Sequence, residues 1–316
     1  MTTEQKSHLS RLDLSRLIWS SRWKRWRDSI RMLLGHPLGG VGAALIILFA
    51  LMALAHPVLM ATVWKRVTYH PMVGFDYDYG PHPLPASLRH LLGTDSLGRD
   101  VLSQLLYGAR TSFGLGLTAG AIAASIATAV GIASAYYGGW LDAVLMGLSD
   151  TFVLLPPPIV LLIVGLLVED MQWPQLALLY GLFAGLGSPA IVLKAQAMSI
   201  RARQYIEAAR VAGGGSLHII WRHVLPHMLP LSFLFLMFTA SGSVLTEALL
   251  SFFGRTQIRL SWGTMIWFGQ VTFRWSAAGE QWHVILPPAL AIMFFCGAFY
   301  MVGRAVEEVF HPHRRR

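Results

Sequence analysis

The chain is poor in charged residues and in cysteine. Lys, Arg, Asp and Glu make up 13% of its 316 residues, against about a quarter in an ordinary soluble domain. The one cysteine, Cys296, excludes an intrachain disulfide framework. Because 54% of the residues are hydrophobic and the mean hydropathy is +0.53, the composition also excludes a disordered chain and argues against a water-soluble enzyme. It predicts an integral membrane protein.

Motifs for nucleotide hydrolysis and for hydrolytic catalysis are missing as well. None of the lysines follows a glycine, so the chain lacks a P-loop, in which a Gly-Lys pair helps to hold phosphates. It contains neither an H-E-x-x-H zinc motif nor a G-x-S-x-G nucleophile motif. We therefore expect no catalytic residue and no cofactor bound by this chain, and a membrane hydrolase is unsupported.

Six uncharged tracts reach or approach the length of about 20 residues that a membrane-spanning helix needs. They are residues 32–64, 111–141, 151–168, 171–193, 223–246 and 281–303. The third tract is long enough only if it extends back through Asp150, and a seventh, 260–273, predicts an interfacial or re-entrant segment. The pattern predicts an all-α membrane protein with about six transmembrane helices, the first at 39–64 and five more in a core at 111–303.

The basic residues indicate the orientation in the membrane. If the loops alternate between the two sides, 17 Lys and Arg fall on one side and 8 on the other. Cytoplasmic loops carry the excess, which predicts that both termini are cytoplasmic, although a chance imbalance in a basic protein is the alternative. The net charge of +9 then reflects a lipid bilayer and not a nucleic acid partner. The predicted cytoplasmic parts are 1–38, 195–224 and 304–316, and the predicted external loops are 65–110 and 251–283.

The N-terminal segment predicts an amphipathic helix over residues 14–34. Its apolar positions, which include Trp19, Trp23 and Trp26, recur at helical spacing beside six basic residues. Such a helix suits the cytoplasmic membrane interface, and a calmodulin-type target is the alternative. We expect no cleavable signal peptide, because this segment is polar and the first apolar tract is long enough to be a span.

Two of the predicted spans carry signs of a packed bundle with a pathway. Gly116, Gly120 and Ala124 have the small-xxx-small spacing that lets helix backbones approach closely in a bilayer. Three consecutive prolines from Pro156 remove backbone donors inside the third span. A broken helix at that depth is tolerated against protein or a water-filled cavity, and a simple kink is the alternative.

Three residues are candidates for a transport pathway. They are Asp150, Pro156 and Glu247. Ionisable residues within spans are functional candidates by default. For Glu247, an interhelical packing role is the alternative to substrate binding.

The loop 201–226 predicts a helix, a glycine turn and a second short helix that leads into the next span. The first helix has a small-residue face at Ala208, Ala209 and Ala212, and the turn falls at residues 213–215. Small side chains permit close docking of a partner, and charged neighbours can fix its orientation. A solvated amphipathic loop is the alternative.

The order and spacing of Glu207-Ala208-Ala209, Gly213 and Leu225-Pro226 resemble the EAA loop of ABC importer permeases, which sits in a cleft of the ATP-hydrolysing subunit. His223 stands where the general pattern has an apolar residue, but Arg-His-Val-Leu-Pro resembles the peptide-permease branch. The resemblance implies ATPase-coupling roles for Arg203, Tyr205, Glu207, Ala208, Ala209, Arg210, Gly213, Arg222, His223, Leu225 and Pro226.

Two more segments resemble that branch, the dipeptide, oligopeptide and nickel permeases. Residues 90–110 are similar to its stretch before the second span, and residues 245–263 are similar to its LTEASLSFLG and SWG stretches. The glycine run at 213–215 and the polar link 255–259 depart from the family pattern. The motif residues before the second span are Gly93, Thr94, Asp95, Gly98, Arg99 and Asp100.

The resemblance implies a type I importer permease in the cytoplasmic (inner) membrane of a prokaryote. Its implied partners are a second homologous permease subunit, two P-loop ATPase subunits and an extracytoplasmic solute-binding protein. ATP and Mg would be used by the ATPase subunits. The implied function is translocation of peptides by alternating access. Nickel, opines or other small solutes are alternatives within the family, and an ATP-independent secondary transporter is the alternative outside it.

The polar residues before the second predicted span have a structural and a functional interpretation. Asp95, Arg99 and Asp100 predict a helix-capping ion-pair cluster, with Thr94 or Asp95 as the N-cap, and direct ligand contact is the alternative. The acidic stretch 76–79 predicts a polar turn. We expect no metal site, because the loop histidines lack a regular ligand spacing.

Overall fold

The uncharged tracts fold into helices in the computed structural model, which describes residues 31–78, 82–168, 171–254, 258–275 and 282–310. Four helical runs are long and apolar enough to cross a membrane. Two bent helix pairs can each supply one more span, so the prediction of an all-α membrane protein with about six spans is confirmed. The amphipathic helix predicted over 14–34 lies almost entirely outside the described residues, as do residues 311–316 of the basic tail, whereas 304–310 are helical.

The four long runs comprise α2, α4, the continuous segment Ser216–Phe252 and most of α13. The first bent pair, α5 with α6, turns by 83°, and the second, α7 with α8, turns by 47°. The helices are α2 (Pro37–Thr62), α3 (Arg66–Tyr69), α4 (Val101–Tyr137), α5 (Gly139–Leu154), α6 (Pro157–Leu167), α7 (Trp173–Leu186), α8 (Ser188–Arg201), α9 (Gln204–Val211), α10 (Ser216–Ile219), a π-helical turn (Ile220–Val224), α11 (Leu225–Phe252), α12 (Trp262–Trp275) and α13 (Trp282–Phe310).

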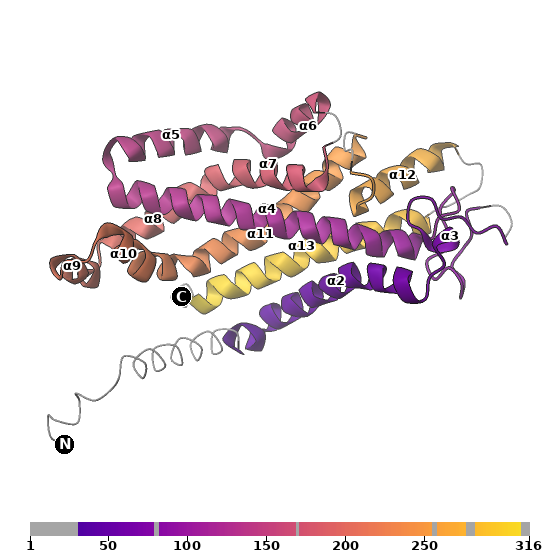
Figure 1. The fold of residues 1–316 in the computed structure, drawn as a ribbon, viewed down its shortest axis with the longest axis horizontal. Helices are drawn as coiled ribbons and strands as arrows, with labels where there is room; N and C mark the ends of the chain where they lie inside the picture. Colours follow the sequence, from indigo (N-terminus) through magenta and orange to yellow (C-terminus); the bar gives the residue numbers. More distant parts are fainter. Residues whose placement is uncertain (1–30, 79–81, 169–170, 255–257, 276–281, 311–316) are drawn as a thin grey trace, which may run out of the picture.

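Helix α4 runs through the middle of the bundle and packs against α2, α7, α8 and α11 (Figure 1). Its glycines bring the backbones together. A β-carbon on Gly120 would lie 2.6 Å from the carbonyl oxygen of Leu236 in α11, and one on Gly116 would lie 3.0 Å from Cζ of Phe295. Against α7, a β-carbon on Gly185 would lie 2.8 Å from the Ala123 carbonyl oxygen of α4. The predicted close packing through small residues is confirmed.

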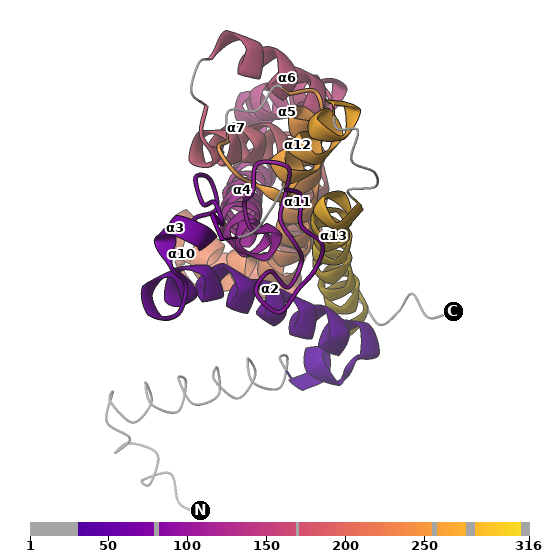
Figure 2. The same ribbon diagram turned by 90° about the vertical axis from the view of Figure 1, so that its right-hand side faces the viewer.

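The two long loops lie at opposite ends of the molecule (Figure 1). Helix α3 and residues 70–78 and 82–100 form one end, called here the α3 end, and Figure 2 looks onto it. Helices α9 and α10 form the other, the α9 end. His36 Nε2 lies 3.0 Å from Glu308 Oε2, which joins the start of α2 to the last turn of α13. Both of these helix ends lie toward the α9 end (Figure 1).

Buried apolar side chains form two separate cores. The first is aromatic: the ring of Phe295 lies 5.6 Å from that of Trp262 and 4.6 Å from that of Phe299, between centroids. The second core, at the α9 end, includes Ala127 of α4 and Leu193 of α8 together with Ile206 of α9. The short helices at that end are therefore packed onto the bundle.

Several span boundaries differ from those predicted: α5 begins at Gly139 and not at 150 or 151, α11 continues to Phe252, and α13 continues to Phe310. Helix α4 begins at Val101 and not at 111, because the helix continues through Arg110, whose side chain is exposed on its surface. The tract 171–193 bends at Gly187, and α8 begins at the next residue, Ser188. By contrast, the break predicted at the three prolines is confirmed, because α6 begins at Pro157 with Pro156 as its N-cap.

We expect Gly120→Ala to destabilise the protein although alanine favours a helix by about 1 kcal/mol over glycine. The added β-carbon would meet the Leu236 carbonyl oxygen at 2.6 Å, and overpacking of this kind costs about 1–3 kcal/mol. The measurement is the thermal midpoint of the detergent-purified protein. Gly147→Ala is the matched control, because a β-carbon there meets nothing within 4 Å. A midpoint for Gly120→Ala at or above that of Gly147→Ala would contradict the prediction.

Candidate functional site

The loop predicted to dock a partner is the α9 end of the molecule. Helix α9 stops at Ala212, and Gly213 follows with φ of +85°, a left-handed conformation that glycine adopts without strain. The Gly214 N–H donates to the Ala209 carbonyl at 3.0 Å, which closes the turn. Helix α10 and the π-helical turn then lead directly into α11. The predicted order of helix, glycine turn and second short helix is confirmed.

One face of α9 anchors it and the other faces outward. Ile206 is buried in the second core beside Ile219 of α10. Ala209 packs against the same core, so it belongs to the inner face, whereas Ala208 and Ala212 are exposed. The other predicted docking residues divide similarly: Arg203, Tyr205, Glu207, Arg210, Gly213, Arg222 and Pro226 are exposed, and His223 and Leu225 are half-buried.

Large apolar side chains are exposed beside these residues, and the sequence analysis missed them. Val211 is 86% exposed, Leu217 is 67% exposed and Trp221 is 68% exposed. An apolar surface that is rimmed by charged residues is typical of a contact with another protein. In the sequence these residues read as ordinary members of amphipathic helices, so only their exposure distinguishes them.

The motif before α4 forms a compact polar cluster, called here the Asp95–Arg99 cluster. Arg99 Nη2 lies 2.6 Å from Asp95 Oδ2, which confirms the predicted ion pair, and Gln104 donates to the same oxygen. The Arg99 guanidinium also lies 4.9 Å from the ring centroid of Phe268, which connects the Asp95–Arg99 cluster to α12. Gly93 and Gly98 have φ of +77° and +76°, so both turns in this segment need glycine.

The predicted N-cap is wrong. Asp100 caps α4, because its Oδ1 accepts a hydrogen bond from the Ser103 N–H at 2.6 Å. Thr94 instead bonds His82 and the Leu84 N–H. Several residues here suit an N-cap, and the start of the helix decides which of them does so.

A buried histidine joins two aspartates at the α3 end. His90 Nδ1 lies 2.8 Å from Asp100 Oδ2, and His90 Nε2 lies 3.1 Å from Asp76 Oδ2. All three side chains are at most 2% exposed, and Arg89 Nε lies 2.8 Å from the same Asp76 oxygen. The polar turn predicted here is present at residues 77 and 78, where the Asp78 N–H donates to Asp76 Oδ1 at 3.1 Å. The sequence did not predict that Asp76 is also an internal anchor, which joins the loop to the start of α4 through His90.

The two aspartates have pKa values shifted in opposite directions. Burial acts to raise the pKa of Asp76, but the hydrogen bonds from His90 and the Asp78 backbone, with the charge of Arg89, outweigh it and lower the pKa. Burial raises the pKa of Asp100 despite the hydrogen bonds that it accepts from His90 and Ser103. Within the described residues, no group of three or more His, Cys, Asp or Glu is arranged to hold a metal ion.

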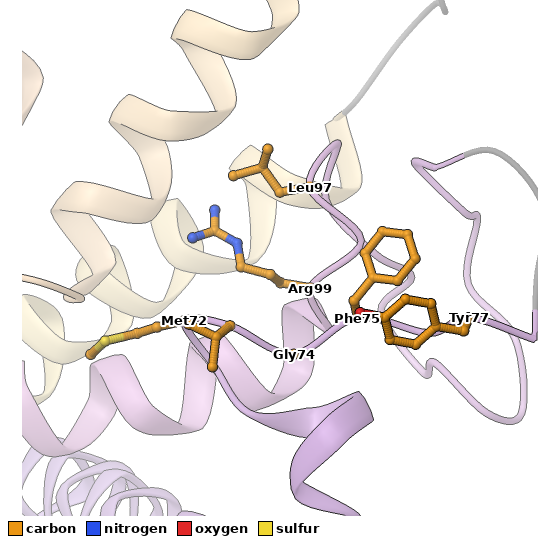
Figure 3. A pocket seen from close by; sticks show the side chains of 7 residues that line it. Met72, Gly74, Phe75, Tyr77, Leu97 and Arg99 are labelled. Carbon is orange, nitrogen blue, oxygen red and sulfur yellow. The ribbon is translucent and has the colours of Figure 1, made fainter.

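An open pocket of about 290 Å³ lies beside the Asp95–Arg99 cluster (Figure 3). Its lining is mostly apolar, with Phe75 and Tyr77 on one side and Met72 on the other. Arg99 supplies the charge, but its guanidinium is already paired with Asp95. The pocket therefore offers apolar contact with little free charge.

The candidate pathway residues are dispersed. Glu247 is fully buried, and its Oε1 accepts hydrogen bonds from Ser251 at 2.7 Å and from Ser261 at 2.6 Å. Because Ser261 immediately precedes α12, this carboxyl joins α11 to α12. Asp150 is exposed on α5, and Pro156 stands at the bend between α5 and α6. The structure does not bring these three residues together.

Comparison with known proteins decides the family. Residues 102–316, more than half of the chain, match the family model described as the inner membrane component of binding-protein-dependent transport systems. The chain belongs to this family of permeases. It is accordingly an ABC transporter permease and a multi-pass protein of the inner membrane.

Named relatives of the permease come from several bacteria. The oligopeptide transport system permease protein OppC of Mycobacterium tuberculosis is 30% identical over 76% of this chain and 81% of its own length. A Brucella suis protein provisionally named a peptide transport system permease is 33% identical over 72% of this chain and 75% of its own length. A protein of Escherichia coli K12, provisionally named the D,D-dipeptide transport system permease DdpC, is 28% identical over 89% of each chain.

We expect His90→Ala to destabilise the α3 end of the permease strongly. The change leaves the Asp76 and Asp100 side chains buried without their shared partner, and removing one partner of a buried charged group typically costs about 3–5 kcal/mol. The measurement is hydrogen exchange of the amides in 66–78 and 87–100. Asp78→Asn is the control: it is 72% exposed, so the loss should stay below about 1 kcal/mol. Equal effects of the two variants would refute the anchor role of His90.

Acid is expected to loosen the α3 end only below the ordinary aspartate range. The pKa of Asp76 is lowered from 3.8, so the stability that its ionised form contributes is present above that value and is lost as the pH falls through the folded pKa. The pKa of Asp100 is raised, so its protonation on acidification stabilises the folded form. Hydrogen exchange, corrected for intrinsic rates, should show protection kept at about pH 5 and reduced at about pH 3.

Asp76→Asn is the control for this pH dependence. Because asparagine does not titrate, the variant should be less protected at neutral pH and should lose little more protection on acidification. Loss of protection in the unchanged protein already at about pH 5 would contradict the assignment.

Proposed function

We propose that this permease is the transmembrane subunit of an ABC importer that carries peptides across the cytoplasmic membrane. The observation that carries the proposal is the two-sided packing of the short helix α9. Ile206 is buried in the second core and fixes the helix to the bundle, whereas Glu207 and Val211 are exposed on its outer side. Such a rigid, partly apolar projection fits a cleft in a partner protein. The names of the relatives OppC and DdpC support peptides as the solute.

The importer has further subunits. A second homologous permease pairs with this chain to enclose the pathway, two P-loop ATPases receive the α9 loops, and an extracytoplasmic binding protein delivers the solute at the α3 end. ATP and Mg²⁺ are used by the ATPases. In this arrangement both termini and α9 are cytoplasmic, which agrees with the excess of basic residues in those segments.

The mechanism is alternating access. Closure of the ATPases on ATP moves the α9 loops, and the bundle changes between inward-open and outward-open states. In this chain the loop is continuous with α11 through α10 and the π-helical turn. The contribution of the permease is thus mechanical, and Pro156 at the bend between α5 and α6 marks a break in the helices where a pathway can run.

The first test is purification of the tagged permease in mild detergent, with mass spectrometry of its companions and an ATPase assay. Recovery of a second permease and P-loop ATPases is the expected result. Uptake into proteoliposomes of labelled dipeptides, oligopeptides, Ni²⁺ and an opine then identifies the solute. A lone chain that transports without ATP would refute the importer and favour a secondary carrier.

Changes in the α9 loop should lower transport without affecting insertion into the membrane. Glu207→Gln removes a charge-assisted interfacial bond, so uptake should fall by about tenfold. Gly213→Ala forces a side chain into a left-handed conformation, so uptake should fall several-fold. Uptake and ATP hydrolysis by the reconstituted complex are the measurements.

Two matched controls define the expected specificity. Glu307→Gln makes the same acid-to-amide change on α13, outside the α9 loop, where an amide oxygen can still accept the hydrogen bond that Arg304 donates at 2.7 Å. Gly215→Ala makes the same change two residues from Gly213, where φ is −66° and a β-carbon meets nothing within 4 Å. If the controls lower uptake as much as the α9 variants do, the coupling role of the loop is refuted.

A further inference from the structure

The aromatic ring of Tyr136 lies close to two arginines at the α9 end. The Cζ atom of Arg201 and the Cζ atom of Arg210 each lie 5.9 Å from its ring centroid, within reach of a cation–π attraction. The three residues come from different helices: Tyr136 from the last turn of α4, Arg201 from the end of α8 and Arg210 from α9. The ring is thus a lateral contact between α9 and the longest helix of the bundle.

A hydrogen bond and an apolar layer fix the geometry of this contact. Arg201 Nη1 donates to the Ala135 carbonyl at 2.6 Å. That carbonyl belongs to the last turn of α4, where carbonyl groups lack partners within the helix and attract cations. Beneath it, Ile132 and Ala135 of α4 share the second core with Ile206 of α9. Contacts that do not involve Arg210 therefore hold the side chains of Arg201 and Tyr136 in place. The cation–π contact of Arg210 is made with a ring that is already fixed.

We propose that Tyr136 is a positioning residue that transmits movement of α9 to α4, through the contacts of its ring with Arg210 of α9 and Arg201 of α8. This inference rests on the proposed function, because it assigns a path to the mechanical coupling. The path along the chain from α9 to α11 contains a glycine turn and a π-helical turn. The path through Tyr136 bypasses both.

The position of α4 gives this path its importance. Helix α4 packs against α2, α7, α8 and α11 with backbone contacts so close that β-carbons would clash. Close-packed helices move as bodies and transmit displacement. A displacement that begins at the last turn of α4 is therefore transmitted to most of the bundle. It also reaches the α3 end, through the N-cap Asp100 at the other end of the helix.

The alternative is that Tyr136 only stabilises the local packing. A packing role predicts a less stable protein with an unchanged ratio of solute transported to ATP hydrolysed. A transmission role predicts that this ratio falls while the complex still assembles and hydrolyses ATP. The ratio is therefore the measurement that separates the two.

The experiment uses the assembled importer in proteoliposomes, with the co-purified ATPases and binding protein. Tyr136→Leu removes the aromatic face but keeps an apolar side chain, and the transport-to-ATP ratio should fall about threefold or more, the factor expected for losing one or two cation–π contacts. Tyr136→Phe keeps the face and should restore the ratio. Tyr300→Leu removes a tyrosine ring of similar exposure, 54%, from α13, where it stacks on Phe238, and should leave the ratio unchanged.

A double-mutant cycle tests the partner. If Tyr136 acts through Arg210, the double variant Tyr136→Leu with Arg210→Gln should be no worse than the more severe single variant. Should Tyr136→Leu fail to assemble, Arg201→Met keeps the test with Tyr136 in place. It removes the cation beside the ring and the donor to the Ala135 carbonyl, so the ratio should fall, and an unchanged ratio overturns the path.

The outcomes separate this inference from the proposed function. An unchanged ratio in Tyr136→Leu, or a loss that Tyr136→Phe does not restore, overturns the role of Tyr136. Failure of the unchanged complex to assemble or to import overturns the proposed function itself. Additive losses in the cycle would show that Tyr136 and Arg210 act independently, which also overturns the path.

Discussion

The rest of the structure depends on the close approach of α4 to its neighbours. Within a bilayer, association of helices gains little from the hydrophobic effect and comes mainly from backbone-close packing. Gly120 against the Leu236 carbonyl and Gly185 against the Ala123 carbonyl make that packing possible on two faces of one helix. Because α4 cannot shift against α7 or α11 without opening these contacts, the loops at its two ends are held in a fixed relation.

The two ends are built by different physical means. At the α3 end, contacts between buried polar and charged side chains fix a segment with little regular secondary structure. These contacts are the ion pair of Asp95 with Arg99 and the contacts of His90 with two aspartates. At the α9 end, apolar side chains such as Ile206 fix short helices and leave charged residues outside. The first arrangement fixes polar loops by internal contacts. The second leaves an exposed surface that other proteins can contact.

Periodicity and composition predicted the spans, the break at the prolines and the helix–turn–helix form of the α9 loop, because each is a local property of the chain. Contacts between distant residues were not predictable in this way. Asp76 and Asp100 meet at His90 although all three lie in or beside irregular segments, where no period applies. Tyr136 read as an ordinary end of a span, since the arginines beside it come from two other helices. The start of α4 was missed because one exposed arginine interrupts an otherwise uncharged helix.

Asp100 uses its two oxygens for different purposes: Oδ1 accepts the Ser103 N–H and Oδ2 contacts His90. One carboxylate thus closes the first turn of α4 and also holds the preceding loop. Fraying of the first turn and release of the loop are therefore coupled, because both contacts use the same carboxylate. Whatever restrains the start of α4 also restrains the polar loop in front of it.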